Sequence, residues 1–583
     1  MSYIVRAKWV VVAGPEVVTD AAVVIDGEQI AEVGAWSDIR ARFGELPVYG
    51  GDRYALVPGF VNAHHHSNGV TSVQQGIPDR ALEPWLLSLA GGRRANPALQ
   101  TKLAAARQLR AGITSVVDVH QGGGTAAAFH DGVQARLAAY EETGMRASLA
   151  AGVAERSFLI AGEDEAFLAS LPADLRELAE RRLPGPDAIS RDEYFESMRR
   201  LFDAWRDHPR VSLRFGPPGP QWVHDETLVR MAEISRETGM NIQTHLEESI
   251  YEKLAGPRMT GRSVVEHLHA LGVLSPRFSC AHGVWLSDAE VEILAGRGAA
   301  VSHNPSSNLR LRSGIAPLNA LLSGGVTTGI GLDGTTLNDN DDMWQEMRLA
   351  LRLHRTPGLD GPAPEPGDIF ELATSAGAAL FAGGPYGRAG AALAGAGGTG
   401  RGGAEANAER VGRDGAALAG AGRLDTGQAR PGNPGGAPAG AHSDQGAGPS
   451  DAGASPGTMA PGMIAPGTIA PGAPADLVLL DMSRMTRPWV APEADPLTLL
   501  VYRASADDVD SVFVEGRQVV EGGRVLTVDE AALEAELAEE LAANPVPEEN
   551  IRIVQRLTPH IEAWYRNWKL PGLTPRTVYN SRE

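Results

Sequence analysis

The sequence predicts an α/β protein: a (β/α)8 TIM-type barrel with a small β-sandwich domain built from both chain ends, and a long disordered insertion. Eight apolar β-type runs alternate with amphipathic helical stretches between about residues 56 and 380, which is typical of a parallel sheet closed into a barrel. Short β-type segments lie before and after that region, so we expect both chain ends in the small domain. A Gly/Ala-rich stretch predicts the insertion.

The N-terminal segment, residues 1–56, is expected to form the first part of the β-sandwich. Its residues 3–12, 21–25 and 29–33 alternate in polarity or are β-branched between Gly and Asp turns. The barrel is expected over residues 57–383. An open doubly wound sheet is the alternative, but no G-x-G-x-x-G follows a first strand. The predicted barrel strands are 57–65, 113–119, 146–153, 211–216, 241–246, 277–282, 299–303 and 327–332.

The stretch after the barrel has an unusual composition. Residues 384–467 contain 24 Gly and 21 Ala, and such a segment cannot bury enough apolar surface to offset its conformational entropy. We therefore predict a disordered linker there. The second part of the β-sandwich is expected over 468–527, and a C-terminal helical extension over 528–583, with helices at 530–543 and 549–568.

The composition disfavours several classes of protein. A net charge of −20 disfavours nucleic acid as a partner, because phosphates need a basic surface. The single Cys excludes a disulfide framework and a zinc cluster of several thiolates. The N-terminus lacks the layout of a signal peptide and no apolar run reaches 18 residues, so we expect a cytoplasmic protein with no membrane partner.

A run of three histidines closes the first predicted barrel strand, in Pro-Gly-Phe-Val-Asn-Ala-His64-His65-His66. Side chains alternate across a strand, so His64 and His66 share one face and His65 takes the other. At the C-terminal end of a barrel strand, such a pair can hold one divalent metal ion.

Other strand ends carry further histidines and acids. His245 and Glu248 lie at the fifth strand, and His282 closes the sixth. His303 closes the seventh strand, and Asp333 ends the eighth in Gly-Leu-Asp-Gly. Because all strands of a barrel end at one mouth, we expect these side chains to converge on a single site.

In this order the motifs resemble the amidohydrolase superfamily, in particular its aminohydrolase and chlorohydrolase branch, which includes S-adenosylhomocysteine/methylthioadenosine, guanine and 8-oxoguanine deaminases and the triazine hydrolases. The matching segments are Pro-Gly-Phe-Val-Asn-Ala-His-His-His, His-Leu-Glu-Glu, Ala-His-Gly-Val-Trp-Leu, Ser-His-Asn-Pro-Ser-Ser-Asn and Gly-Leu-Asp-Gly. The resemblance reaches from the first strands to about residue 530, interrupted by the Gly/Ala-rich stretch. It implies a metal-dependent hydrolase of a non-peptide C–N bond, and most simply the hydrolytic deamination of an amino-substituted nitrogen heterocycle.

The resemblance also implies a role for each matching residue. His64, His66, His245 and Asp333 match the ligands of one divalent metal ion, zinc or, as an alternative, Fe²⁺. Glu248 matches the acid that moves protons, and His282 the imidazole that orients the metal-bound water, so the expected catalytic set is Glu248, His282 and Asp333. A bound metal ion lowers the pKa of water from about 15.7 toward neutrality.

The lysines bear on the number of metal ions. In the binuclear branch of the superfamily, a carbamylated lysine on a middle strand bridges two metal ions. This chain has only Lys8, Lys102, Lys253 and Lys569, and none of the four lies on a predicted barrel strand. A mononuclear site is therefore expected.

The predicted substrate contacts are Gln75, Trp85, Gln221, Trp222 and His303. The two tryptophans could sandwich a flat ring or could pack a helix on the barrel. The glutamines could bind ring edges or lie in solvated loops. Where the nucleoside deaminases of the branch carry a histidine after the fourth strand, this chain has Gly-Pro-Pro-Gly-Pro, which disfavours an adenosine-like substrate.

Two alternatives to deamination remain. One is a dechlorinase or N-dealkylating hydrolase of a triazine-like ring. The other is a catalytically inactive binding or scaffold protein on the same fold, since a fold does not determine a function. In either hydrolase reading we expect a small heterocyclic substrate as the partner, and a homo-oligomer, dimer or tetramer.

Overall fold

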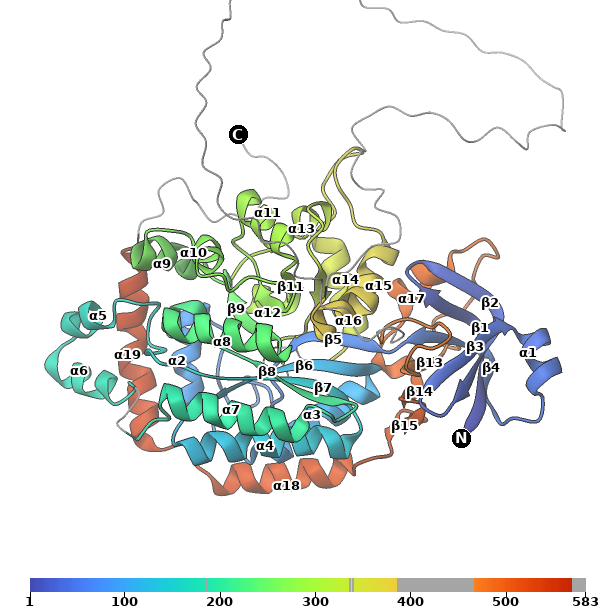
Figure 1. The fold of residues 1–583 in the computed structure, drawn as a ribbon, viewed down its shortest axis with the longest axis horizontal. Helices are drawn as coiled ribbons and strands as arrows, with labels where there is room; N and C mark the ends of the chain where they lie inside the picture. The colour runs from blue at the N-terminus through green and yellow to red at the C-terminus, as the bar shows by residue number, and fades with distance from the viewer. Residues whose placement is uncertain (184–186, 335–336, 338–339, 385–465, 569–583) are drawn as a thin grey trace, which may run out of the picture. The chain divides into compact units, whose positions relative to one another are not determined.

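The computed structural model describes the chain except for residues 184–186, 335–336, 338–339, 385–465 and 569–583. The predicted disordered linker, 384–467, lies almost entirely outside the described residues. Two separate sheets of eight strands each organise the rest (Figure 1).

The first of these is a parallel sheet whose strands follow one another in chain order. Its two outer strands meet, because the Asp333 amide donates to the His64 carbonyl at 3.0 Å and the Leu332 amide to the Asn62 side chain at 3.0 Å. The predicted (β/α)8 barrel is therefore confirmed. Its strands are β5 (Phe60–His65), β6 (Ile113–Gly122), β7 (Arg146–Val153), β8 (Val211–Phe215), β9 (Ile242–Leu246), β10 (Phe278–His282), β11 (Ala300–His303) and β12 (Thr328–Ile330).

Helices separate the barrel strands. Several begin at Ser-x-x-Glu capping boxes, in which serine and glutamate satisfy amides that the helix leaves unpaired; α7, α10 and α11 start in this way at Ser190, Ser263 and Ser287. The helices are α2 (Leu82–Ser88), η1 (Leu89–Gly91), α3 (Pro97–Arg110), α4 (Ala126–Thr143), α5 (Asp164–Ser170), α6 (Ala173–Glu180), α7 (Arg191–Trp205), η2 (Pro220–Trp222), α8 (Asp225–Thr238), α9 (Ile250–Thr260), α10 (Val264–Ala270), α11 (Asp288–Arg297), α12 (Pro305–Arg310), α13 (Leu318–Ser323), α14 (Met343–Leu353), α15 (Pro366–Ala373) and α16 (Ser375–Ala382).

The second sheet is built from both ends of the chain, as predicted. Its order is β16-β15-β14-β13-β4-β1-β2-β3, and the N-terminal β4 pairs with the C-terminal β13. The sheet is curled: β4 and β13 lie between β1 and β14 in the strand order, yet the ring of Tyr3 on β1 stacks on that of Phe513 on β14, with centroids 5.5 Å apart. Its strands are β1 (Ser2–Ala13), β2 (Glu16–Asp26), β3 (Gln29–Ala35), β4 (Val48–Pro58), β13 (Leu477–Asp481), β14 (Val509–Val514), β15 (Arg517–Glu521) and β16 (Arg524–Val525), with the helices α1 (Trp36–Phe43), α17 (Pro496–Arg503) and η3 (Ala506–Asp508) beside them.

One predicted strand combines parts of two strands of the structure. The run predicted as a single strand over 57–65 is divided at Gly59, so that β4 belongs to the small sheet and β5 to the barrel. A side chain at Gly59 would come within 2.2 Å of Thr114, and Pro58 has no amide hydrogen to continue the pairing. The chain therefore changes sheets at this position.

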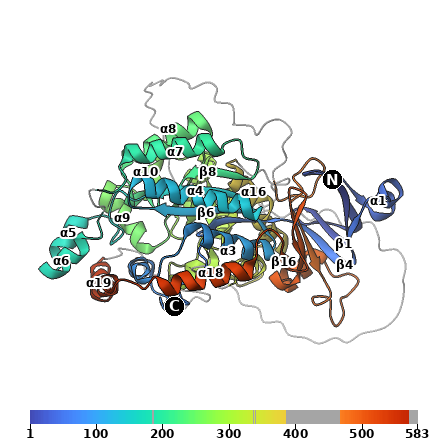
Figure 2. The same ribbon diagram turned by 90° about the horizontal axis from the view of Figure 1, so that it is seen from below.

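Two helices end the described chain. α18 (Glu530–Ala543) packs along α3, as Figure 2 shows, and α19 (Glu548–Arg566) packs against α2 and α6. Both lie within two residues of the predicted helices at 530–543 and 549–568. Within the described ranges, none of the helices has both the length and the apolar character needed to cross a membrane.

Candidate active site

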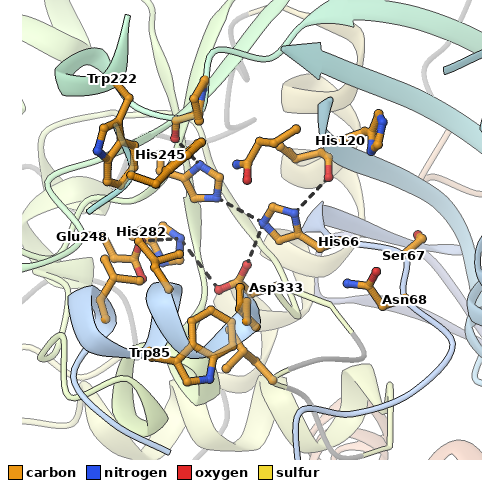
Figure 3. Close-up of a pocket in the computed structure, with 18 of the residues that line it drawn as sticks. His66, Ser67, Asn68, Trp85, His120, Trp222, His245, Glu248, His282 and Asp333 are labelled. Atoms are coloured by element: carbon orange, nitrogen blue, oxygen red, sulfur yellow. Dashed lines mark hydrogen bonds and ion pairs between the residues drawn. The ribbon is translucent and has the colours of Figure 1, made fainter. Parts of the chain in front are cut away.

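A cavity of about 300 Å³ opens at the mouth of the barrel, where the parallel strands end. His66, His245, Glu248, His282 and Asp333 contribute to its lining. Figure 3 shows their side chains directed toward one another from different strand ends. The structure thus brings together residues that are as far apart along the chain as the first and the eighth barrel strand.

Each of the four imidazoles at this centre is oriented through its Nδ1 atom. The nearest partner of each Nδ1 is a carbonyl-type oxygen, which can only accept a hydrogen bond, so we assign the proton to Nδ1 and the lone pair to Nε2. At His282 the Asn304 side-chain nitrogen is a second, longer neighbour of Nδ1, at 3.3 Å. Nδ1 donates to Gln243 Oε1 from His64 at 3.1 Å, to the Val119 carbonyl from His66 at 2.9 Å, to the Pro218 carbonyl from His245 at 2.6 Å and to Asn308 Oδ1 from His282 at 2.9 Å.

The Nε2 atoms meet around the Asp333 carboxylate. Asp333 Oδ1 lies 3.0 Å from His64 Nε2 and 3.5 Å from His66 Nε2. His66 Nε2 and His245 Nε2 are 3.1 Å apart, although both present lone pairs. The buried Nε2 atoms of His64 and His282 have no hydrogen-bond partner among the described residues. Lone pairs that face one another in this way repel unless a cation lies between them, so these residues fit a metal ion.

The metal-binding geometry admits more than one set of four ligands. Ligand atoms of His64, His245, His282 and Asp333 all lie within 4.8 Å of one another. His66, which the family resemblance places among the ligands in preference to His282, has its Nε2 atom 3.1 Å from that of His245. Five groups therefore surround the centre, one more than a tetrahedral zinc site uses.

Burial sets the protonation of the centre. It lowers the pKa of His66 and of His282 to about 4, and that of His245 well below its ordinary value. Burial alone would raise the pKa of Asp333, but the imidazoles of His282 and His64 outweigh it and hold that pKa below its usual range. At neutral pH the imidazoles of His66, His245 and His282 are therefore neutral and Asp333 is a carboxylate, which suits a divalent metal ion.

The backbone at two strand ends adopts the left-handed region. φ is 78° at His282 and 58° at Asp333, a conformation that costs about 1–3 kcal/mol for residues other than glycine. The glycines of the Gly-Leu-Asp-Gly motif allow the backbone around Asp333 to lie close to His66 and to Asn304. A side chain at Gly334 would come within 2.6 Å of the His66 carbonyl, and one at Gly331 within 2.4 Å of Asn304.

Glu248 lies beside the centre, between β9 and α9. Its Oε2 atom is 3.5 Å from His282 Nε2, and its amide donates to Glu252 Oε2 at 2.9 Å. Burial raises the pKa of Glu248 well above its ordinary value, and the charge of Asp333 adds to the effect. The position and the affinity for a proton suit a group that moves protons at this centre.

Aromatic and aliphatic side chains form the outer wall of the cavity. Trp85 and Trp222 both line it, and Phe158 packs on Trp222 with ring centroids 4.9 Å apart. In the view of Figure 3, Trp222 lies toward His245 and Trp85 toward Asp333. The leucines of the wall are Leu82, Leu86, Leu89 and Leu337.

The other three predicted substrate contacts do not belong to this lining as described. Gln75 accepts a hydrogen bond from the Arg93 amide at 2.7 Å. Gln221 lines a separate cavity of about 110 Å³. His303 is buried, and its Nε2 atom lies 2.9 Å from His354 Nε2.

Gln121 lines the cavity and is not among the predicted contacts. It lies on β6 beyond residue 119, where the predicted strand ends. Val119 and Gln121 share a face of β6 by the period of two; His120 also borders the cavity, although its side chain takes the opposite face of the strand. Figure 3 shows the His120 ring turned away from the centre, and its Nε2 atom lies near Gly132 of α4. A longer β6 with this alternation was the signal that could have identified Gln121.

Arg136 also lines the cavity but is held by its own partners. Its Nη1 atom donates to the Ser67 carbonyl at 3.1 Å and to Thr101 at 3.0 Å, and lies 3.6 Å from Asp118. The Ser67 amide donates in turn to Asp118 at 2.9 Å. This buried group fixes the segment that follows His66.

A closed parallel barrel with a histidine–carboxylate centre at its mouth defines a class of protein, the metal-dependent barrel hydrolases. The sequence profile of the amidohydrolase family matches residues 55–387, and the chain belongs to that family. The resemblance inferred from the sequence is confirmed.

Several known proteins are similar to this chain over nearly its whole length. A protein of Methanopyrus kandleri named 5'-deoxyadenosine deaminase is 26% identical over 92% of this chain and 98% of its own length. The structure of an adenosine deaminase from Xanthomonas campestris with bound zinc has a TM-score of 0.66 at 24% identity, covering 95% of this chain and 98% of that one. An atrazine chlorohydrolase from Arthrobacter aurescens complexed with zinc has a TM-score of 0.66 at 19% identity, covering 92% and 100%.

Proposed function

We propose that this chain is a mononuclear metal-dependent aminohydrolase that deaminates an amino-substituted nitrogen heterocycle. The observation that carries the proposal is the set of Nε2 lone pairs converging on Asp333, with the Glu248 carboxyl 3.5 Å from His282. The deaminase names of relatives such as the Methanopyrus kandleri protein support the reaction.

His64, His66, His245 and Asp333 would hold the metal ion, with His282 left beside it. When bound, a divalent ion lowers the pKa of coordinated water toward neutrality and so supplies a nucleophile at pH 7. Zinc is supported by the zinc in the Xanthomonas campestris deaminase structure. Of the described lysines, Lys253 is engaged by Glu290 at 2.6 Å and none lies on a barrel strand, which supports one metal ion rather than two.

The protein's own groups then move protons and hold the attacking water. Glu248 takes a proton from the water and delivers it to a ring nitrogen or to the leaving amine, a contribution of about 10²–10⁴ in rate. His282 directs Nε2 at the water because Asn308 holds its Nδ1–H. Asp333 accepts from the same water and keeps it oriented toward the ring carbon.

The cavity wall favours a flat, uncharged ring. Trp85, Trp222 and Phe158 offer apolar faces, and the one cationic side chain in the described lining, Arg136, is committed to Asp118 and Ser67. The Gln121 carboxamide has donors and an acceptor that suit the edge of a nitrogen heterocycle. The same wall keeps a triazine-type substrate as the second candidate, with a chloride or alkylamine as the leaving group.

An ammonia-release panel tests the proposal. The zinc-loaded full-length chain is assayed with aminopurines, adenosine, pterins, aminopyrimidines and aminotriazines, and with a chlorotriazine monitored for chloride. We expect ammonia from at least one amino-substituted ring. Chloride release alone would favour the second candidate, and no release from any compound by a metal-loaded protein would contradict the hydrolase assignment.

Two further expectations accompany the enzyme. We propose a homo-oligomer, dimer or tetramer, which light scattering after size-exclusion chromatography tests. We also propose a cytoplasmic location, which fractionation of the source cells tests.

A further inference from the structure

We propose that the C-terminal helix α19 supports the wall of the substrate pocket from behind, and that Tyr565 is a positioning residue that holds the aromatic wall of the cavity in place. The proposal rests on the proposed function only for the identity of the ring that the wall contacts. It assigns a role to the C-terminal extension, whose residues do not themselves line the cavity in the described structure.

The Tyr565 hydroxyl reaches the pocket through one backbone segment. It accepts a hydrogen bond from the Ala161 amide at 2.7 Å, in the segment that follows β7. The adjacent Ile160 carbonyl accepts the indole N–H of Trp222 at 3.3 Å. The ring of Phe158, three residues before Ala161, packs against the ring of Trp222 with centroids 4.9 Å apart. The Tyr565 hydroxyl therefore holds the backbone segment that contains Phe158 and that accepts the hydrogen bond of Trp222, and both of these residues line the cavity.

The ring of Tyr565 contacts the element that follows the catalytic carboxylate. It lies 4.5 Å from the ring of Tyr251, in the first turn of α9, three residues after Glu248. Tyr565 is only 2% exposed, so both of its contacts are shielded from water. A buried polar contact of this kind orders the backbone that it joins.

The apolar face of α19 covers the third pocket-forming segment. Ile553, Leu557 and Ile561 share one buried cluster with Leu87 of α2. α2 and the short η1 that follows it carry Trp85 and Leu89 of the cavity wall. Figure 1 shows α19, in red, running beside α2, and the contacts between the two helices agree. The segments that carry Trp85, Phe158 and the backbone partner of Trp222 are therefore all in contact with one helix that is remote in sequence.

A purely stabilising helix and a positioning helix predict different results. If α19 only adds buried surface, loss of the Tyr565 hydroxyl lowers overall stability and leaves the pocket segment no more mobile than the rest of the barrel. If it positions the wall, the loss frees residues around Ala161 selectively and weakens the contact with substrate while the metal centre stays intact.

The matched control is Tyr194 of α7. Its hydroxyl is also buried and also bonds to the backbone, donating to the carbonyl of Ala151 within β7 at 2.9 Å. Tyr194 does not line the described cavity. Tyr565→Phe and Tyr194→Phe each remove one oxygen atom, so a comparison of the two separates loss of a buried hydrogen bond from loss of the wall's support.

The experiment measures amide hydrogen exchange and steady-state kinetics on both full-length variants. We expect Tyr565→Phe to raise exchange in peptides spanning 156–162 by about tenfold or more, and Tyr194→Phe to leave them unchanged. On the best compound of the panel we expect KM to rise about tenfold in Tyr565→Phe, with kcat within about twofold and metal content unchanged.

Unchanged exchange over 156–162 in Tyr565→Phe would overturn the proposal, as would an equal rise in Tyr194→Phe or a fall in kcat with no change in KM. The exchange measurement needs no substrate. A panel without turnover therefore contradicts the proposed function while the role of Tyr565 is still decided by exchange.

Discussion

Every imidazole of the centre is oriented from the side away from the cavity. Gln243, on β9, which does not pair with β5, accepts from His64 although it lies 179 residues away along the chain. Backbone carbonyls do the same for His66 and His245. Such partners determine the tautomer and leave Nε2 free to face a metal ion.

Strand alternation predicted that His64 and His66 share a face, and the convergence of barrel strands predicted the meeting with His245 and Asp333. The hydrogen-bond partners could not be predicted, because they depend on the register between strands. Gln121 was missed because the predicted end of its strand came too early, at residue 119.

Glu248→Gln tests the proton-transfer role. The substitution keeps the size and polarity of the side chain but removes the group that can take up and release a proton, so turnover should fall by about 10²-fold or more while metal content is unchanged. The measurement is kcat for ammonia release, with metal analysis on the same samples. Activity equal to that of the unmodified chain would remove Glu248 from the mechanism.

His66→Ala and His282→Ala distinguish the two possible ligand sets. We expect His66→Ala to lose most of its metal ion, because its Nε2 lies 3.1 Å from that of His245 in the centre. His282→Ala should retain metal and lose turnover, since its Nε2 faces the Glu248 carboxyl at 3.5 Å. Metal analysis after dialysis decides, and the opposite pattern would make His282 the ligand and His66 the orienting group.

At the scale of elements, local sequence patterns predicted where helices lie better than they predicted how the helices pack against one another. The Ser-x-x-Glu boxes and the apolar periodicity determine where helices begin, and the ends of α18 and α19 lie close to their predicted positions. Periodicity indicates that α19 has an apolar face but not that this face covers α2. The division at Gly59 was also missed, since the run from Ala55 to Val61 is apolar throughout and the lack of space beside Thr114 for any residue larger than glycine is a tertiary feature.

Glu346 of α14 predicts a pH dependence of stability. Burial raises its pKa to about 7, while an unfolded chain leaves it near 4.5. The native state therefore holds a proton that the unfolded state releases between these values, and stability that is present below pH 4.5 is lost as the pH rises through about 7. Glu346→Gln, which stays neutral, should escape up to roughly 3 kcal/mol of that loss.

The measurement is the free energy of unfolding from urea titrations between pH 5 and about 8, by extrapolation to water. Glu237→Gln, at an exposed position of α8, controls for the loss of one negative charge. Parallel pH curves for the unmodified chain and Glu346→Gln would show that Glu346 does not retain its proton on folding.

At the scale of the whole molecule, both chain ends form one sheet. β4 pairs with β1 on one side and with β13 on the other. The sheet of the small domain is therefore complete only when the C-terminal strands are present. Buried Arg146 at the start of β7 bonds to Asp476 at 3.0 Å and Glu515 at 3.1 Å, which joins the barrel to that sheet. The sequence predicted this organisation because strand-type segments flank the barrel, whereas the joining ion pairs have no sequence signal.

Deletion of residues 388–466 tests whether the Gly/Ala-rich stretch contributes to the enzyme. Its composition offers too little apolar surface to form a core of its own. The shortened chain should keep its metal content, and its thermal midpoint should change by less than about 3 °C. Calorimetry and metal analysis check this, and a large loss of metal or of soluble protein would assign the stretch a structural role.

The metal content of the purified full-length chain tests the central claim most directly. Three imidazoles and a carboxylate with deprotonated ligand atoms at neutral pH predict about one divalent ion per chain, and its loss in His245→Ala. The measurement is inductively coupled plasma mass spectrometry on protein whose fold has been verified by circular dichroism. A folded chain that takes up less than about 0.3 divalent ion, even after incubation with zinc, would contradict the account.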